Sequence, residues 1–281
     1  MQVWFRLAYS NLWIALSAGA QVYVNFRLLS APAIWQPVLL ATLAMFWVYT
    51  FAKAVHFDPA ADAANDPDRT AFLKAHRTPL IVTALAGLLL GSWLAASHGA
   101  AVFGLFWTPT LIGLLYDLRF LPPSFRYRRL KDVPGLKGSS VALAWATLCV
   151  GLPAGFGVSA NSDAWLVLYG WNVCMWFVNT TYFDLGDLAG DRLEGTRTLP
   201  VALGYGQTRR LLHFLNILSG LCLWLAVATG LLDPLGLRLL ALHLVQAVLL
   251  FRARDEVCDI SFECDIAFDG IFVFAALCLL W

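Results

Sequence analysis

Charged residues are scarce in this chain of 281 residues. Asp, Glu, Lys and Arg make up 13% of it and hydrophobic residues make up 60%, whereas about a quarter of a typical soluble domain is charged. A soluble domain of this size has too little interior to bury so much apolar surface. The shortage of charge therefore excludes an ordinary water-soluble protein and indicates a chain that lies within a lipid bilayer.

Three other features are also missing. The formal net charge is only +1 and the basic residues do not gather into one stripe, which argues against nucleic-acid binding. None of the six cysteines forms a CxxC pair, so neither a disulfide framework nor a zinc site is indicated. The N-terminal residues lead into an apolar segment without a distinct cleavage region, so we expect a membrane helix there rather than a signal peptide.

Long apolar runs are what the chain has in place of charge. Each run is close to the ~20 residues that a helix needs to cross ~30 Å of hydrocarbon. The sequence therefore predicts an all-α, polytopic membrane protein with nine transmembrane helices in a single integral membrane domain, residues 1–281. The nine runs lie at roughly 9–29, 33–54, 79–97, 99–117, 138–157, 163–183, 208–229, 235–252 and 266–281.

The basic residues indicate an orientation for these spans. If nine spans alternate, all 19 Lys and Arg residues except Arg27 and Arg238 fall on one side. The positive-inside rule places that side, with the N-terminus, in the cytoplasm of an inner or plasma membrane and the C-terminus outside. The long polar segments 55–78, 118–137 and 184–207 lie on the cytoplasmic side, where we expect them to cap a functional site.

The third polar segment, "YFDLGDLAGDRLEGTRTLP", places Asp184, Asp187 and Asp191 at offsets of three and four. These offsets put the carboxylates on one face of a helix that continues out of the sixth span. Two such charges ~6 Å apart repel by about 3 kcal/mol at an effective dielectric of ~20, so a cation must offset them. Clustered carboxylate oxygens are ligands that Mg²⁺ prefers, usually together with substrate phosphates. A solvated acidic helix end is the alternative.

The first polar segment, "HFDPAADAANDPDRTAFLKAH", is a second acidic cluster. Asp58, Asp62 and Asp66 recur every four residues, which again gives one acidic helix face. As an alternative, Asp58 caps a short helix that Pro67 ends, and Asp66 is only part of that ending. Two acidic faces four spans apart are typical of an internal duplication that builds one site between two halves of a membrane fold.

Between the acidic clusters, Lys131 and Lys137 bracket a "DVPGL" turn directly before the fifth span. We expect both lysines to point into a cleft, whereas Arg119, Arg126 and Arg128 are better explained by attraction to anionic lipid headgroups. Two acidic clusters that bind metal, with cationic side chains between them, are suited to hold a diphosphate.

The same segments resemble a known family. "YFDLGDLAGDRLEGTRTLPVALG" is similar to the second aspartate motif of the UbiA superfamily of intramembrane prenyltransferases, and "RLKDVPGLKGSSVALAWA" is similar to that family's loop before the fifth helix. The resemblance covers essentially the whole chain. It implies a UbiA-like helical bundle and the transfer of an isoprenyl group from a prenyl diphosphate to a hydrophobic acceptor, commonly an aromatic ring, among membrane lipids.

The resemblance also implies roles for individual residues. Asp184, Asp187 and Asp191 would bind Mg²⁺ and the donor diphosphate, and Asp58 and Asp62 would hold a second Mg²⁺. The residues that would contact the diphosphate are Lys131, Lys137, Arg69 and Arg192. Candidates for the acceptor pocket are Asn11 in the first span and Tyr116 at the end of the fourth.

The first acidic segment departs from the family's pattern. Ala52 and Lys53 stand where ligands are expected, at the end of the second span. The second Mg²⁺ therefore stays open, as does the choice between prenyl transfer, cyclisation by a UbiA-like terpene cyclase and a non-catalytic lipid-binding, transport or scaffold role. Transport is disfavoured, because transporters keep ionisable groups inside their spans.

Acids and thiols also alternate near the C-terminus, in "CDISFECDIAFD". The irregular spacing of Cys258, Asp259, Glu263, Cys264 and Asp265 predicts a solvated loop rather than a metal site.

Overall fold

The computed structural model describes residues 2–55, 63, 66–117, 122, 127, 133–253 and 260–280. Over these residues the chain is helical and has no strand, which confirms the predicted all-α class. The helices are α1 (Gln2–Tyr9), α2 (Leu12–Leu28), α3 (Trp35–Val55), α5 (Pro67–Ser97), α6 (Ala100–Asp117), α7 (Leu136–Gly155), α8 (Ser162–Gly186), α9 (Leu188–Glu194), α10 (Leu199–Leu203), α11 (Tyr205–Ala228), η2 (Pro234–Leu239), α12 (Leu240–Arg252), η4 (Ile260–Phe268) and α13 (Ile271–Cys278).

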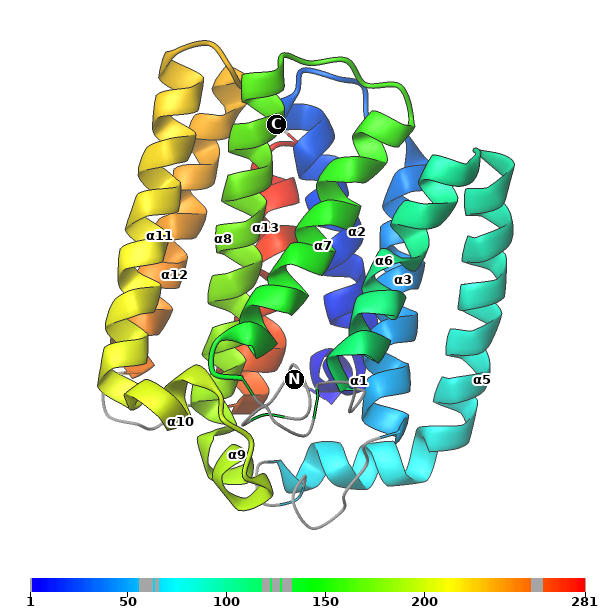
Figure 1. Ribbon diagram of the computed structural model, residues 1–281, viewed down its shortest axis with the longest axis vertical. Coiled ribbons are helices and arrows are strands. Elements are labelled where there is room, and N and C mark those ends of the chain that lie inside the picture. The colour runs from blue at the N-terminus through cyan, green and yellow to red at the C-terminus, as the bar shows by residue number, and fades with distance from the viewer. Residues whose placement is uncertain are drawn as a thin grey trace.

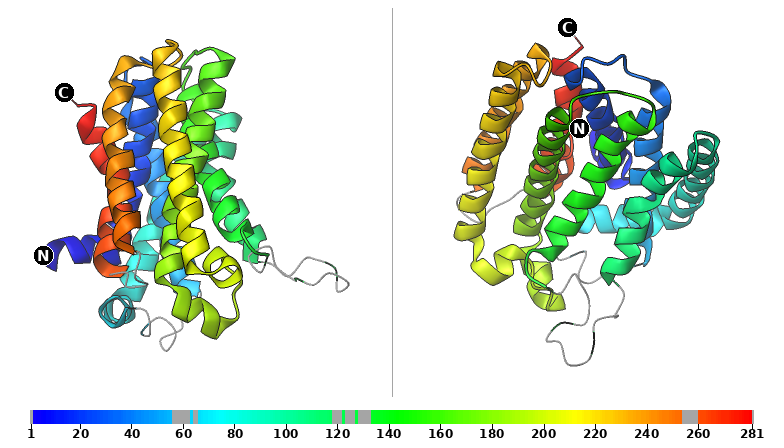
Figure 2. Two further views of the ribbon diagram at one scale, coloured as in Figure 1. Left: turned by 90° about the vertical axis from the view of Figure 1, so that its left-hand side faces the viewer. Right: turned by 45° about the horizontal axis from the view of Figure 1, so that its top comes forward.

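The long helices run side by side along one axis (Figure 1), and the two ends of the chain lie at opposite ends of the bundle (Figures 1 and 2). The short helices α1, α9 and α10 lie at the end that holds the N-terminus. Each predicted apolar run coincides with one or two helices. Five helical segments of the described chain are long and apolar enough to cross a membrane; the number nine and the orientation stay predictions. The five are Trp35–Ala54, Pro67–Ser97, Leu136–Gly155, Tyr205–Ala228 and Pro234–Arg252.

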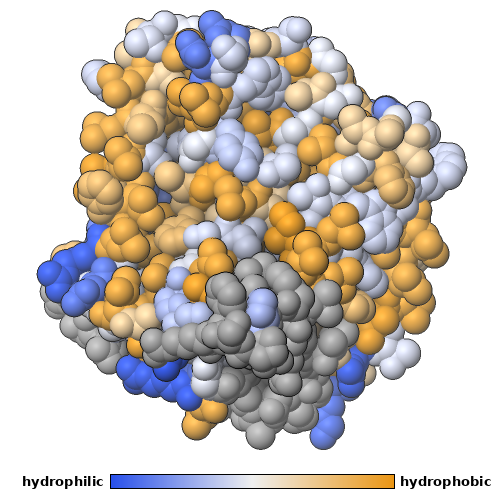
Figure 3. Space-filling view, viewed as in Figure 1, coloured by the Kyte–Doolittle hydropathy of each residue, from blue (hydrophilic) through white to orange (hydrophobic). Residues whose placement is uncertain are grey.

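The outer surface of the bundle is apolar. Large hydrophobic side chains on α5 and α11 are turned outward, among them Trp93, Leu89 and Phe214, each at least 60% exposed. Figure 3 shows hydrophobic residues along the flanks, with most of the strongly hydrophilic ones towards the two ends. Exposed apolar area of this extent has no favourable contact with water, so the chain is a multi-pass membrane protein.

Inside the bundle, α2 is the central helix and carries a polar network. The Gln21 and Asn25 side chains face Asn172 of α8, with the Gln21 Nε2 atom 2.8 Å from Asn172 Oδ1 and the Asn172 Nδ2 atom 3.0 Å from Asn25 Oδ1. Asn25 Nδ2 also donates to the carbonyl of Cys149 on α7 at 3.0 Å. Buried amides that satisfy one another hold membrane helices together, so α2 fixes α7 and α8 around the site described below.

The polar segments at the N-terminal end contain more helix than predicted. Pro67 begins α5, with the Asp66 side chain accepting from the Arg69 backbone N–H at 2.9 Å as N-cap. Proline is favoured at the first helical position, where its missing N–H is not needed. The alternative in which Asp58 caps a short helix that Pro67 ends falls mostly on residues outside the described ones and stays a prediction. Asp58 and Asp62 lie outside the described residues.

Helix α5 first crosses the N-terminal end of the bundle and then turns to run along its edge (Figure 1). Pro79 lies inside this 31-residue helix, and a proline within a helix removes one backbone hydrogen bond and bends it. The bend allows the first turns of α5, including Arg69, to lie across the open end of the bundle.

The contact between α2 and α3 leaves no room for a side chain at Gly19. A methyl group there would lie 2.9 Å from the carbonyl oxygen of Val38, so the two helices would have to separate. We expect Gly19→Ala to lower stability by about 1 to 3 kcal/mol, as overpacking does, measured as a lower midpoint of thermal unfolding in detergent. Gly104→Ala is the matched control, because nothing lies within 4 Å of its added methyl group; an equal loss in both variants would contradict the close contact.

Candidate active site

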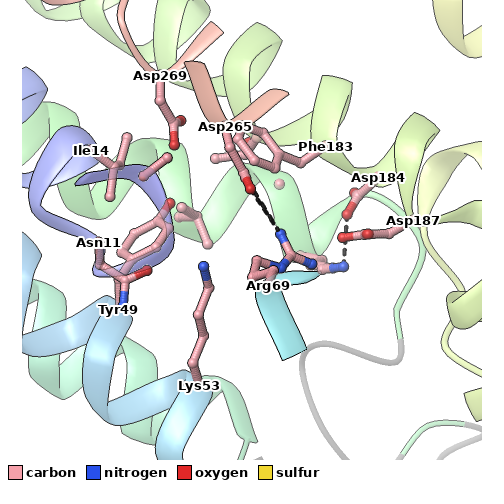
Figure 4. A pocket seen from close by; sticks show the side chains of 15 residues that line it. Asn11, Ile14, Tyr49, Lys53, Arg69, Phe183, Asp184, Asp187, Asp265 and Asp269 are labelled. Carbon is pink, nitrogen blue, oxygen red and sulfur yellow. Dashed lines mark hydrogen bonds and ion pairs between the residues drawn. The ribbon is translucent and has the colours of Figure 1, made fainter. Parts of the chain in front are cut away.

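A cavity of about 290 Å³ opens at the N-terminal end of the bundle. Figure 4 shows charged side chains pointing into it from several helices that are far apart in the sequence. Apolar side chains such as Ile14, Val141 and Phe183 line the rest. The polar residues of the lining are Asn11, Tyr49, Lys53, Arg69, Lys137, Thr180, Asp184, Asp187, Asp265 and Asp269.

One wall of the cavity is formed by the end of α8. Lys137, from the first turn of α7, places its ammonium 2.7 Å from Asp184 Oδ1 and 3.5 Å from Asp191 Oδ1. The Thr198 hydroxyl also donates to Asp191 Oδ2 at 2.8 Å. Lys137 is therefore the cation that the sequence predicted, because its ammonium offsets the repulsion between the Asp184 and Asp191 carboxylates.

The sequence predicted one continuous helix for the three aspartates, and this is wrong. Helix α8 ends at Gly186, and Asp187 is both its C-cap and the residue before α9. The break leaves Asp184 and Asp187 in the lining of the cavity, while Asp191 reaches the site through Lys137. The structure therefore gathers the three carboxylates by a helix break rather than by helical periodicity.

Asp187 has a carboxylate oxygen that could bind a metal ion. Its Oδ1 atom is buried and has no hydrogen-bond partner among the described residues. Burial raises the pKa of the Asp187 carboxyl above its ordinary value, and the nearby Arg69 and Lys137 oppose this shift. A cation placed at Oδ1 would favour the ionised form further.

The opposite wall is η4, a π-helix, which carries Asp265; Asp269 follows it directly. The Arg69 guanidinium lies 3.4 Å from both carboxylate oxygens of Asp265. Lys53 of α3 points into the cavity between these groups (Figure 4). The two walls thus present carboxylates toward one another, with Arg69 and Lys53 between them.

The predicted solvated loop is wrong for residues 263–269. Glu263, Cys264, Asp265 and Asp269 are buried. Side chains of neighbouring helices bind backbone carbonyls of this segment: Trp13 Nε1 donates to Ile266 at 3.0 Å and Asn179 Nδ2 donates to Phe268 at 3.1 Å. These bonds explain why the segment packs instead of fraying into solvent.

Several predicted site residues do meet in the cavity. Asp184, Asp187, Lys137, Arg69 and Asn11 line it. Others do not. Arg192 is exposed and is not part of the lining. Tyr116 lies in the last turn of α6, and its side chain is not described; Asp58, Asp62 and Lys131 lie outside the described residues.

The lining residues that the sequence interpretation missed include Tyr49, Lys53, Asp265 and Asp269. From the sequence, Lys53 is only a residue that stands where a metal ligand is expected. A signal for the two aspartates existed, because they are four residues apart in a largely apolar segment, where an ionisable residue is a functional candidate by default. Irregular spacing with the neighbouring acids and thiols hid this pair.

The donor set of the α8 wall fits Mg²⁺. Within the described part of the chain, no three acidic, His or Cys side chains are close enough to hold a metal ion alone. Mg²⁺ does not require such a cage, since it is usually bound by one or two carboxylates together with substrate phosphates and water. Asp187, with its unpartnered oxygen, and Asp184 next to it supply those carboxylates.

The contact of Lys137 with two carboxylates can be tested by its removal. We expect Lys137→Met to destabilise the protein by about 1 to 3 kcal/mol in Mg²⁺-free buffer, because it removes a cation that offsets the buried carboxylates of Asp184 and Asp191. The measurement is the unfolding midpoint. Adding Asp184→Asn should restore part of the loss, and Lys74→Met on the exposed face of α5 should cause none. A loss that Asp184→Asn does not reduce would contradict the pairing.

Comparisons with known proteins identify the family of the chain. The sequence model of the UbiA prenyltransferase family matches residues 57–268. A digeranylgeranylglyceryl phosphate synthase of Natronomonas pharaonis is 26% identical over 201 residues, which is 68% of this chain and 65% of that protein. The match therefore spans just under two thirds of that relative's length.

Solved structures show the same fold. The structure of a UbiA homolog from Archaeoglobus fulgidus bound to GPP and Mg²⁺ superposes with a TM-score of 0.64 at 15% identity, over 99% of both chains. The same homolog bound to DMAPP and Mg²⁺ gives a TM-score of 0.63 at 16% identity, over 99% of this chain and 98% of that one. With its charged cavity, its helical bundle and a family match over three quarters of its length, the chain belongs to the UbiA prenyltransferase family.

Proposed function

We propose that this protein catalyses the Mg²⁺-dependent transfer of an isoprenyl group from a prenyl diphosphate to a hydrophobic acceptor within the membrane. Aromatic compounds are one class of acceptor that this proposal includes. The observation that carries the proposal is the cavity itself, where carboxylates and cations meet at one end of an apolar bundle. Relatives with GPP or DMAPP and Mg²⁺ bound support it. Because the charged residues of the cavity lie at or near helix ends at one end of the bundle, the arrangement suits a one-sided reaction better than transport.

The α8 wall would hold the diphosphate. Asp184, Asp187 and Asp191 are the candidates for binding Mg²⁺, which when bound neutralises negative charge on the diphosphate and so eases its departure. Lys137 and Arg69 lie in the same cavity and are placed to contact phosphate oxygens directly. We propose that four further residues complete the diphosphate site. Arg192 lies outside the lining of the cavity, and the other three, Lys131, Asp58 and Asp62, lie outside the described residues.

The apolar and aromatic lining would receive the prenyl chain. When the bond between the prenyl carbon and the diphosphate oxygen breaks, positive charge develops on the allylic carbon. The rings of Tyr49 and Phe183 line the cavity, where an aromatic face stabilises a cation by about 0.5 to 2 kcal/mol. The surrounding helices exclude water, so that the allylic carbon reacts with the acceptor and is not hydrolysed.

Ligand-dependent stability tests the diphosphate site. Mg²⁺ with a short prenyl diphosphate should raise the unfolding midpoint of the wild-type protein by several degrees, since a ligand at 100 times its Kd stabilises by about 2.7 kcal/mol. Asp187→Ala should lose this protection, because it removes the unpartnered carboxylate. Asp163→Ala, an exposed acid at the other end of α8, should keep it. Wild-type protein that gains no protection from any such donor with Mg²⁺ would contradict the proposed function.

We also propose that the cavity faces the cytoplasm and that segments 55–78, 118–137 and 184–207 cap one integral membrane domain. The support is the one-sided distribution of basic residues, with Arg27 and Arg238 among the few at the other end. A phosphatase that folds only outside the cytoplasm should therefore be active when fused after Trp281 and inactive when fused before Met1. The reverse pattern would overturn the orientation without affecting the chemistry.

A further inference from the structure

The inner half of the cavity carries polar groups that the diphosphate site leaves unused. They are Asn11, Lys53 and Asp269, and Figure 4 shows them apart from the α8 wall, with Arg69 between the two sets. The inference drawn from them rests on the proposed function, because it concerns the second substrate of the same reaction.

Asp269 offers an unpartnered acceptor. The residue is 7% exposed, and its Oδ1 atom has no hydrogen-bond partner in the part of the chain that the structure describes. Its backbone carbonyl accepts from the Ser17 hydroxyl of α2, and the preceding carbonyl, that of Phe268, accepts from the Asn179 amide of α8 at 3.1 Å. Asp269 is therefore held firmly from two helices while one oxygen is left for a ligand in the cavity.

Asn11 offers a second unpartnered acceptor. It is 1% exposed and occupies the break between α1 and α2 with a left-handed φ of 63°, a conformation that Asn tolerates better than most residues. Its Nδ2 atom donates to the Thr50 hydroxyl at 3.3 Å, whereas Oδ1 has no partner among the described residues. A buried acceptor without a donor costs about 1 to 3 kcal/mol, so a donor is expected to reach both Asn11 and Asp269.

Lys53 offers a cation. Its ammonium points into the cavity (Figure 4) and makes no hydrogen bond or ion pair with any described residue. Asp265 and Asp269 act on it electrostatically, and Arg69 repels it. Because Asp265 is already engaged by Arg69, an oxygen-bearing ligand is the partner that would satisfy Lys53.

We propose that Asn11, Lys53 and Asp269 form the acceptor subsite, and that Asp269 is the base of the reaction. The subsite would take an acceptor that presents a hydroxyl hydrogen to Asp269 Oδ1 and a second oxygen to Lys53. Donor and acceptor then meet in one cavity, with the diphosphate on the α8 wall and the nucleophile on the η4 wall.

The chemical step balances with these groups alone. The bond between the prenyl carbon and the diphosphate oxygen breaks, and its electron pair leaves with the diphosphate. A lone pair of the acceptor hydroxyl forms the new carbon–oxygen bond, and the hydroxyl proton passes to the Asp269 carboxylate. Asp269 later returns this proton to water.

The test uses the full-length protein in detergent with Mg²⁺ and geranyl diphosphate. The probes are an alkyl glycerol phosphate and 4-hydroxybenzoate, each compared with its O-methyl ether, which lacks the hydroxyl hydrogen. We expect the wild-type protein to prenylate at least one hydroxyl probe, with release of pyrophosphate, and neither ether. Asp269→Asn should lower kcat by about 10²- to 10⁴-fold, as loss of a general base does, and abolish the acidic limb of the kcat–pH profile, while donor protection against heat is kept. Lys53→Met should mainly raise the KM of the probe.

Glu263→Gln is the matched control, since it removes an equally buried acid of η4 that contacts Tyr182 and Arg252 and does not line the cavity; its turnover should stay within about twofold of wild type. Wild-type turnover in folded Asp269→Asn would overturn the inference, as would loss of donor protection in that variant. If Asp269→Asn does not fold, an unchanged KM in Lys53→Met overturns it. Donor protection without prenylation of either hydroxyl probe also overturns it and leaves the proposed function standing, whereas no donor protection in the wild type contradicts the proposed function.

Discussion

The active-site end of this protein depends on the neutralisation of like charges inside an apolar bundle. Five carboxylates, those of Asp184, Asp187, Asp191, Asp265 and Asp269, converge there from α8, α9 and the C-terminal segment. Each buried charge is costly unless it is paired. Lys137 binds two of them and Arg69 binds a third. These two cations therefore pair with three of the five carboxylates.

Irregular backbone aims the remaining groups. Asn11 has a left-handed backbone between α1 and α2, and α8 ends directly before Asp187. Asp265 in the π-helix and Asp269 directly after it both line the cavity. Breaks of this kind are found at functional sites because the surrounding packing can hold them. Here that packing is supplied by Trp13, Ser17 and Asn179.

The two halves of the cavity have different electrostatic character. On the α8 wall the carboxylates are already arranged around cations, which suits a site that exchanges its ions with a diphosphate and a metal. On the other side, Asp269 Oδ1 after η4 has no hydrogen-bond partner among the described residues, and the Lys53 ammonium of α3 feels the nearby Asp265 and Asp269 carboxylates. A reaction between a charged donor and a polar nucleophile needs both environments in one water-poor space, and the bend of α5 brings Arg69 between them.

The sequence by itself determined the membrane class, the nine apolar runs and the cluster of Asp184, Asp187 and Asp191, because hydrophobicity and local spacing are properties of neighbouring residues. Lys137 was also within reach, since it stands directly before a span. Only the tertiary structure decided that Lys53 and Asp269, more than two hundred residues apart, share a cavity. They come together because α2 packs against both α3 and the C-terminal segment, and no local pattern encodes which distant helix ends will meet.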